Sequence, residues 1–397
     1  MSGFDPSTAD PRDIRNPVFA TDGRENETKA LEFFLFASMG FGSITIAGLP
    51  VGELSMGLIV LLALTKRPTR VPPTILLTLV AAVPVWMILV SPIDHVTPYR
   101  RLLHLVLWGL IAVYIGQGRV HMQTMARGFA FGLVVSLGSG LFGVAARNED
   151  GGIGYVGRLT GFVGDPNAAG FYVLVLGLVA CAYLRSRPQV VLFLITATPL
   201  LVLTWSRTSL FAAAACLVWL LIGHRVTPVL GVLILAGLVY AIAHFPPELK
   251  HLGPFNDRGG SDELRARIDA GSAQLVHTAG LTGHGPGTSM VPDLTEPGNY
   301  FFFHNSYSSV INEGGWIGFG IVVGLLLVAM LHLTRLDLRH RNGWVEAAII
   351  SSAVVAINLG EVLLELPTAI AIGAAAYHLG RPAANVDEER EELRWPF

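Results

Sequence analysis

Charged residues are scarce in this sequence. Only 14% of its 397 residues are Asp, Glu, Lys or Arg, whereas 52% are hydrophobic and the mean hydropathy is +0.55. A water-soluble protein of this length has too small an interior to hide so many apolar side chains. We therefore predict an integral membrane protein of the all-α class, built as a polytopic bundle of transmembrane helices.

Cysteine is nearly absent, and neither sign of charge dominates. Cys181 and Cys216 both lie within apolar runs, where a free thiol behaves as a small hydrophobe, so we expect neither a disulfide framework nor a cysteine metal site. The formal net charge of −2 gives no basic bias toward nucleic acid. His, Asp and Glu show no metal-ligand spacing, and the turn 283–287 lacks the Lys-Ser/Thr pair of a phosphate-binding loop. We expect no metal, no cofactor and no nucleic-acid partner.

Polar residues fill both ends of the chain. Residues 1–29 have mixed charge and include Pro6 and Pro11, and no apolar run begins near the start, which argues against a cleaved signal peptide. Residues 381–397 contain an acidic run from Asp387 to Arg394. We predict that both segments are cytoplasmic tails, the first of them disordered, and that residues 30–380 form the membrane domain.

Twelve apolar stretches approach or reach the length of about 17–25 residues that crosses a bilayer as a helix. They cover residues 31–48, 51–65, 72–91, 101–117, 121–145, 167–184, 188–204, 207–223, 227–244, 303–333, 345–361 and 364–380. The second is short and the tenth has an ambiguous start, so eleven and thirteen spans are the alternatives.

The orientation follows from Lys and Arg residues in the short loops. With both termini in the cytoplasm, ten of these residues lie in cytoplasmic loops and five in outer loops. This arrangement places residues 92–100, 146–166 and 245–302, together with the turns 204–207 and 361–364, on the outer face of the cytoplasmic membrane.

The stretch 245–302 is a long polar run between two apolar segments, and such loops are usually functional or disordered. We interpret this one as functional. Residues 262–269 predict a short helix capped by Ser261, and this helix carries Arg265 and Arg267. A solvated helix face accounts for both arginines, and anion binding is the alternative, for which we favour Arg265.

Other polar residues lie near the predicted outer ends of spans, and each has two interpretations. Arg207 is either an interfacial anchor beside Trp205 or a clamp for phosphate oxygens. His304 is either a packed interfacial residue or a general acid or base. Asp165 is either the cap that starts a span or, like Arg158 in the same loop, a substrate ligand.

Glu313 lies in an otherwise apolar stretch, and a carboxylate within a membrane segment is a functional-site candidate. On one continuous helix, Glu313 and His304 would point about 180° apart, so we do not expect a direct pair between them.

Four short motifs occur in a recognisable order. They are Gly164-Asp165-Pro166-Asn167, Thr204-Trp205-Ser206-Arg207, Arg265 followed by Gly283-x-Gly285, and His304-Asn305 followed after nine residues by Gly315-x-x-Gly318. Over roughly residues 145–365, the chain resembles the O-antigen ligase and O-antigen polymerase superfamily.

The resemblance implies a multi-pass glycosyltransferase of the cytoplasmic membrane that takes an undecaprenyl-diphosphate-linked glycan as donor. The glycan would pass, with inversion and without a required metal, to a lipid, glycan, wall-polymer or protein acceptor. Arg207 and Arg265 would bind the donor diphosphate, and His304 would orient or deprotonate the acceptor. The candidate set is therefore His304 and Glu313 as catalytic residues and Arg207, Arg265, Arg267, Arg158, Asp165 and Asn305 as substrate-binding residues.

Two other classes of membrane protein fit twelve spans with both termini inside. The first is a secondary transporter or flippase, against which the sparse mid-membrane charges and the outer position of the longest loop both argue. The second is a structural membrane subunit with a partner-binding loop.

Overall fold

The computed structural model of the protein describes residues 18–91, 99–142, 158–243, 259–293 and 300–383. In these residues the chain forms thirteen α-helices and three two-stranded antiparallel strand pairs. Five of the helices, α4, α5, α6, α8 and α11, are long and apolar enough to cross a membrane, and five shorter apolar helices accompany them. The predicted all-α membrane class is therefore confirmed, whereas the count of twelve spans stays a prediction.

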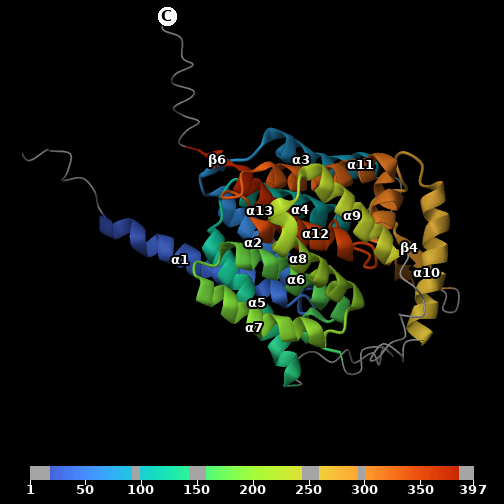
Figure 1. The fold of residues 1–397 in the computed structure, drawn as a ribbon, viewed down its shortest axis with the longest axis horizontal. Helices are drawn as coiled ribbons and strands as arrows, with labels where there is room; N and C mark the ends of the chain where they lie inside the picture. The colour runs from blue at the N-terminus through green and yellow to red at the C-terminus, as the bar shows by residue number, and fades with distance from the viewer. Residues whose placement is uncertain (1–17, 92–98, 143–157, 244–258, 294–299, 384–397) are drawn as a thin grey trace, which may run out of the picture.

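Apart from α1, whose first half is polar, the helices follow the apolar stretches of the sequence, with one exception in the polar loop (Figure 1). They are α1 Val18–Ala37, α2 Val51–Leu64, α3 Thr74–Leu89, α4 Tyr99–Gly116, α5 Met122–Leu141, α6 Pro166–Tyr183, α7 Arg187–Leu203, α8 Arg207–Ile222, α9 Pro228–Ala243, α10 Gly259–Thr278, α11 Ser306–Arg335, α12 Gly343–Val355 and α13 Leu366–Leu379. The exception is α10, the helix predicted within the polar loop, which is longer than the eight residues expected for it.

Two predicted segments have wrong boundaries. The stretch 31–48 does not form one span, because α1 begins at Val18, within the expected tail 1–29, and ends at Ala37. The chain then turns through Ser38–Gly40 into the hairpin of β1 (Thr45–Ile46) and β2 (Leu49–Pro50).

The stretch 345–361 is also interrupted, because α12 ends at Val355 and an irregular connection runs to Glu365. Gly360 in this connection lies directly against the carbonyl oxygen of Phe303, and a side chain at that position would overlap it.

The most buried helices are α6, α12 and α13, which form the centre of the bundle. Helix α13 packs against α4, and α12 packs against α6 and α8. Small residues permit close approach of these backbones, as at Gly373, where an added Cβ would lie 2.9 Å from the Ala112 carbonyl oxygen of α4.

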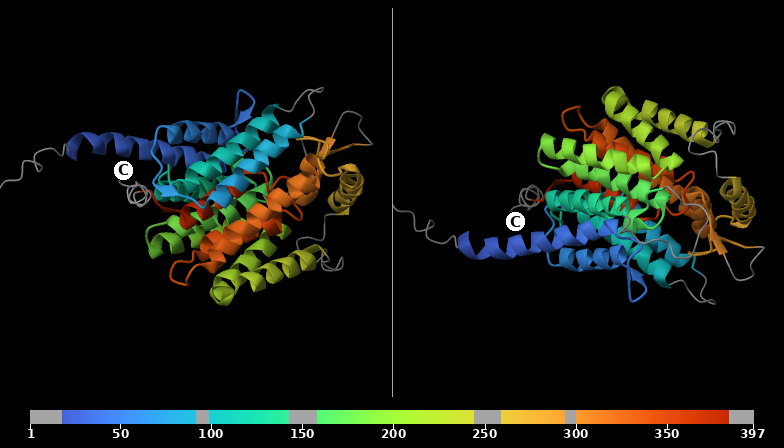
Figure 2. Two further views of the ribbon diagram at one scale, coloured as in Figure 1. Left: turned by 90° about the horizontal axis from the view of Figure 1, so that it is seen from above. Right: turned by 90° about the horizontal axis from the view of Figure 1, so that it is seen from below.

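The connections between helices gather at two ends of the bundle. At one end, Ser43 donates its backbone N–H to the Phe162 carbonyl (2.8 Å), and Leu159 donates to the Leu203 carbonyl (2.9 Å). Helix α10 lies across this same end beside β4 (Met290–Pro292) and β5 (Tyr300–Phe302) (Figure 2).

At the opposite end, Thr69 donates its backbone N–H to the Gln117 carbonyl (2.9 Å), and β3 (Arg70–Val71) pairs with β6 (Arg381–Pro382). Which end faces the cytoplasm stays a prediction.

Helix α11 is kinked at Gly315, whose backbone has φ 67° and ψ −172°. The segment after α10 fills the kink: His284 donates its backbone N–H to the Asn312 carbonyl (2.7 Å), and Ile317 donates to the Leu281 carbonyl (3.2 Å). The kink lies beyond Glu313, but α11 starts only after His304, so His304 and Glu313 do not lie on the one continuous helix considered for them.

Candidate functional site

His304 is held by fixed backbone on both sides. The preceding residue, Phe303, is 1% exposed and donates its N–H to the Ser289 carbonyl (3.2 Å). The following residue, Asn305, is the N-cap of α11, and its Oδ1 accepts hydrogen bonds from Tyr307 N (2.9 Å) and Ser308 N (3.1 Å). The capping role accounts for Asn305 in the motif, and it fixes the backbone from which the imidazole projects.

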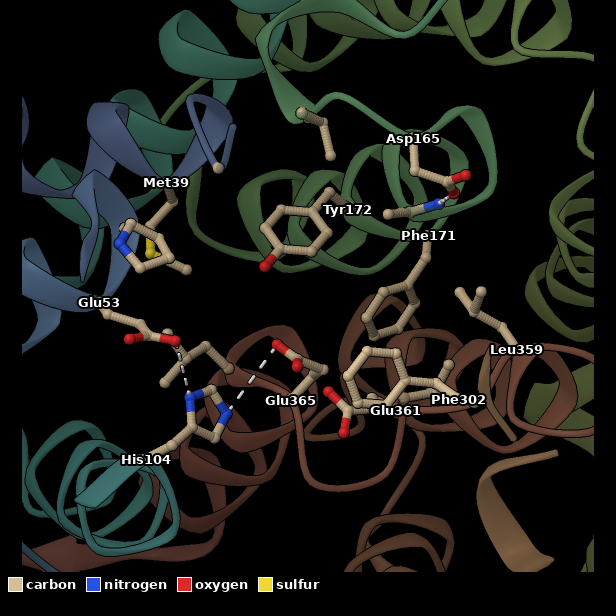
Figure 3. Close-up of a pocket in the computed structure, with 18 of the residues that line it drawn as sticks. Met39, Glu53, His104, Asp165, Phe171, Tyr172, Phe302, Leu359, Glu361 and Glu365 are labelled. Atoms are coloured by element: carbon tan, nitrogen blue, oxygen red, sulfur yellow. Dashed lines mark hydrogen bonds and ion pairs between the residues drawn. The ribbon is translucent and has the colours of Figure 1, made fainter. Parts of the chain in front are cut away.

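Two cavities meet at His304. The first, which we call the inner cavity, has a volume of about 460 Å³ and is lined by residues of α2, α4, α6, β5 and the α12–α13 connection (Figure 3). The second, the outer cavity, has a volume of about 630 Å³ and lies between α10, the start of α11 and the end of α12. Among the polar residues that line the outer cavity are Arg265, Asp269, His277, His304, Asn305 and Asn358.

Arg265 and Asp165 both act on the imidazole of His304. Burial and then the positive charge of Arg265 lower the pKa of His304 to about 4, and the Asp165 carboxylate acts in the opposite direction. The structure thus brings together three of the predicted residues from α10, the start of α6 and the segment before α11. With its pKa lowered in this way, the imidazole is neutral and free to accept a proton at neutral pH.

The structure confirms the capping interpretation of Asp165, whereas its role as a substrate ligand stays a prediction. Asp165 is the N-cap of α6, since its Oδ1 accepts hydrogen bonds from Asn167 N and Ala168 N, both at 2.8 Å, and it also lines the inner cavity. Pro166 follows as the first helical residue, a position that suits its fixed φ.

Arg158 braces this region. Its Nε donates to the Thr204 carbonyl (2.9 Å), and its Nη2 donates to Asn167 Oδ1 (3.0 Å). It therefore ties the turn before α8 to the start of α6, and these contacts with protein oxygens hold Asp165 in place.

Arg207 opens α8 directly after its N-cap, Ser206, and its side chain is half-buried. The start of α8 packs closely on α6, where an added Cβ at Gly170 would lie 2.8 Å from Ser209 Cβ. Arg207 is therefore at the same end of the bundle as His304. The described residues that line the inner and outer cavities do not include it.

Arg267 and Glu313 also lie away from the two cavities. Arg267 lines a third cavity, of about 640 Å³, on a different face of α10, together with Val291 and Phe301. Glu313 is 1% exposed, and its Oε2 lies 3.3 Å from Arg101 Nη2. Neither residue is among the described residues that line the cavities at His304.

Arg101 of α4 joins two carboxylates that the sequence does not show to be near it. Besides Glu313, it contacts Glu361 of the α12–α13 connection, with Nη1 3.4 Å from Glu361 Oε1. An arginine buried within a membrane segment requires charged or polar partners. The position of Arg101 at the start of an apolar stretch was therefore the sequence signal that such partners exist. Glu361 lines the inner cavity.

A second charged group on the wall of the inner cavity was not predicted. His104 Nδ1 lies 3.4 Å from Glu53 Oε1, and His104 Nε2 lies 4.0 Å from Glu365 Oε2 (Figure 3). Arg100 Nη2 contacts the same oxygen of Glu53 at 3.5 Å. These residues come from α2, α4 and the α12–α13 connection, so only the tertiary structure brings them together.

Comparison with known proteins adds no identification, because neither a protein-family model nor a curated protein matches the sequence. The functional argument therefore depends on the short motifs and on the geometry around His304.

Proposed function

We propose that this protein transfers a glycan from an undecaprenyl-diphosphate-type lipid carrier to an acceptor, on the outer face of the cytoplasmic membrane, as an O-antigen ligase or a polysaccharide polymerase does. The observation that carries the proposal is the position of His304, which faces a cavity containing Arg265 on one side and a cavity lined by carboxylates on the other. A transferase needs such a junction, because donor and acceptor must meet at one proton-accepting group.

The reaction forms one bond and breaks one bond. The acceptor oxygen bonds to the anomeric carbon of the glycan from the face opposite the diphosphate, and the bond from that carbon to the phosphate oxygen breaks with its electron pair on the diphosphate. The proton of the acceptor hydroxyl passes to His304 and then to water. The products are the glycosylated acceptor and the lipid diphosphate.

Arg265 supplies the positive charge on the donor side. A guanidinium presents a planar fork of N–H donors that matches phosphate oxygens, and its charge offsets the charge that develops on the departing diphosphate. The Arg265 side chain is half-buried and lines the outer cavity, so solvent screens it less than a fully exposed arginine.

His304 is the proposed base. Its lowered pKa keeps it neutral before the reaction, and the Asp165 carboxylate favours the imidazolium that forms when the acceptor proton arrives. Asp165 is thus proposed as a positioning residue, as is Arg158, which fixes the α6 start. A direct donor contact by Arg207 remains an expectation from the resemblance.

Glu313 is proposed to act through Arg101 and not at the reacting atoms. The carboxylate balances the buried guanidinium, which in turn holds Glu361 at the wall of the inner cavity. Removing Glu313 would leave Arg101 with less compensation, a change that is strongly destabilising for a buried ion pair.

The test is release of lipid diphosphate by the purified full-length protein, with a glycan-loaded undecaprenyl-diphosphate donor, an acceptor extract and EDTA. We expect turnover, and we expect His304→Ala to lower it about a hundredfold or more without lowering the thermal stability of the protein. Movement of the donor across vesicles without release would favour the flippase alternative. Equal turnover by His304→Ala and the wild type would refute the proposed base.

A further inference from the structure

The inner cavity and the outer cavity differ in charge. Asp165, Glu53, Glu361 and Glu365 line the inner cavity, and no Lys or Arg is among the described residues that line it. Arg100 contacts Glu53, and Arg101 contacts Glu361. In each of these pairs the carboxylate lines the cavity and the guanidinium does not. His104 is the one imidazole on this wall besides His304, so a phosphate or carboxylate group entering this space would meet four carboxyl groups and no guanidinium among the described lining residues.

Aromatic rings line the same cavity beside the carboxylates. Phe171 and Tyr172 come from α6, and Phe302 comes from β5, so rings from two separate elements border one space (Figure 3). The two α6 rings meet edge to face, with centroids 5.9 Å apart. An aromatic face carries partial negative charge and attracts the C–H groups of an apolar ligand surface.

Tyr172 provides a polar group without a protein partner. Its hydroxyl makes no hydrogen bond within the described residues, although the side chain is largely enclosed, and it points into the cavity (Figure 3). A tyrosine hydroxyl that reaches a cavity without a protein partner can form a hydrogen bond with a ligand there.

We infer that the inner cavity binds the acceptor, and that the acceptor group bound there is a sugar without phosphate or carboxylate groups. Carboxylates accept hydrogen bonds from the sugar hydroxyls, the Tyr172 hydroxyl donates or accepts one more, and the rings contact the C–H faces of the pyranose. The assignment of this sugar as acceptor rests on the proposed transferase function, whereas its binding to the cavity does not.

Saturation-transfer NMR on the full-length protein in detergent tests the inference. The neutral probes are maltose, lactose and diacetylchitobiose, and the charged probes are the glucuronate-containing disaccharides of hyaluronan and heparosan. We expect saturation transfer to at least one neutral probe and none to the charged probes. Equal or stronger binding of the charged probes would overturn the inference, and so would binding of no neutral probe.

Two variants link the signal to this cavity. Tyr172→Phe removes only the hydroxyl, and Glu365→Gln replaces one carboxyl oxygen with an amide NH2 group, so we expect each to weaken the neutral probe about three- to tenfold. Asp337→Asn makes the matched change at an exposed site at the opposite end of the bundle, and it should leave binding unaltered. If all three variants bind like the wild type, the probe lies elsewhere and the inference fails.

Failure of the inference and failure of the proposed function give different results. Probe binding without release of lipid diphosphate would leave the sugar site in place and refute the transferase. Release of lipid diphosphate with a preference for anionic acceptors would keep the transferase and refute the assignment of the inner cavity.

Discussion

At the residue scale, the central feature is the electrostatic environment of His304. Burial and Arg265 lower its pKa to about 4, and Asp165 opposes them. A base must be neutral to accept a proton, so the proposed transfer should be lost as the pH falls through this pKa and should be constant above it. The lowered pKa therefore extends the active range of the imidazole into mildly acidic conditions.

This environment gives a pH prediction. Arg265→Ala removes a positive charge that disfavours the imidazolium, so the pKa of His304 rises toward its ordinary value of about 6.5. The acidic limb of the residual kcat/KM profile should then move to higher pH, and Asp165→Asn should move it to lower pH. The measurement is the kcat/KM profile of each variant between pH 3.5 and 8. If the acidic limb matched the wild type in both variants, the proposed role of His304 would be contradicted.

Sequence reasoning found some of these residues and missed others for a physical reason. His304, Arg265 and Asp165 each stand out locally, as a polar residue beside an apolar run, and the structure brings them together. The pairing of Arg101 with Glu313 joins positions 212 residues apart, so no local pattern reports it. Arg265 and Arg267 lie two positions apart in the same polar run, so the sequence does not distinguish them. They line different cavities because they project from different faces of α10.

At the element scale, the kink in α11 positions the site. The segment after α10 donates backbone hydrogen bonds to the Asn312 and Glu313 carbonyls, so it is joined to the same helix that begins beside His304. This junction explains Gly315 of the motif, whereas Gly318 packs against Trp86 of α3, to whose Cδ1 an added Cβ would lie 3.2 Å away. Gly315 adopts a conformation that is essentially restricted to glycine, and an added Cβ would overlap the Leu281 carbonyl oxygen.

Substitution of Gly315 should therefore destabilise the protein. We expect Gly315→Ala to lower the free energy of unfolding by about 2 kcal/mol or more, because backbone strain and steric overlap add. Gly324→Ala is the matched control in the same helix, since an added Cβ there meets no atom within 4 Å. Thermal unfolding in detergent should show a lower Tm for the first variant only, and equal Tm values would show that the kink tolerates a side chain.

Most helix positions were predictable from hydropathy, but the start of α1 and the ends of α1 and α12 were not. Apolar length locates α3 to α9, since each of these helices nearly coincides with a predicted stretch. The ends of α1 and α12 depend instead on Gly40 and Gly360, whose close backbone contacts form only in the folded bundle. Hydropathy does not report such contacts, so it extended both stretches too far.

At the scale of the whole molecule, the two ends of the bundle have different chemistry. The end with α10 holds the cavities and the unpaired Tyr172 hydroxyl, as far as the described residues show. The opposite end contains a buried ion pair, in which Arg341 Nη2 lies 2.7 Å from Glu346 Oε2. Trp219 Nε1 donates a hydrogen bond to the same carboxylate oxygen at 2.8 Å. Glycan transfer on the outer face requires that the end with the cavities faces outward.

Cysteine labelling tests this orientation. Leu281 is exposed at the α10 end and Leu338 at the other, and both native cysteines are buried, so the background should be low. In intact cells, we expect a membrane-impermeant maleimide to label Leu281→Cys but not Leu338→Cys, and permeabilisation should expose both. The reverse pattern would place the cavities in the cytoplasm and exclude transfer on the outer face.

The two arginines on α10 give the sharpest test of donor binding beside His304. Arg265 lines the cavity at His304 and Arg267 does not, although they differ by only two positions on one helix. In the lipid-diphosphate release assay, we predict that Arg265→Ala lowers kcat about a hundredfold or more, while Arg267→Ala stays within about twofold of the wild type. Equal effects of the two substitutions would contradict the account, because the donor diphosphate would then not be bound beside His304.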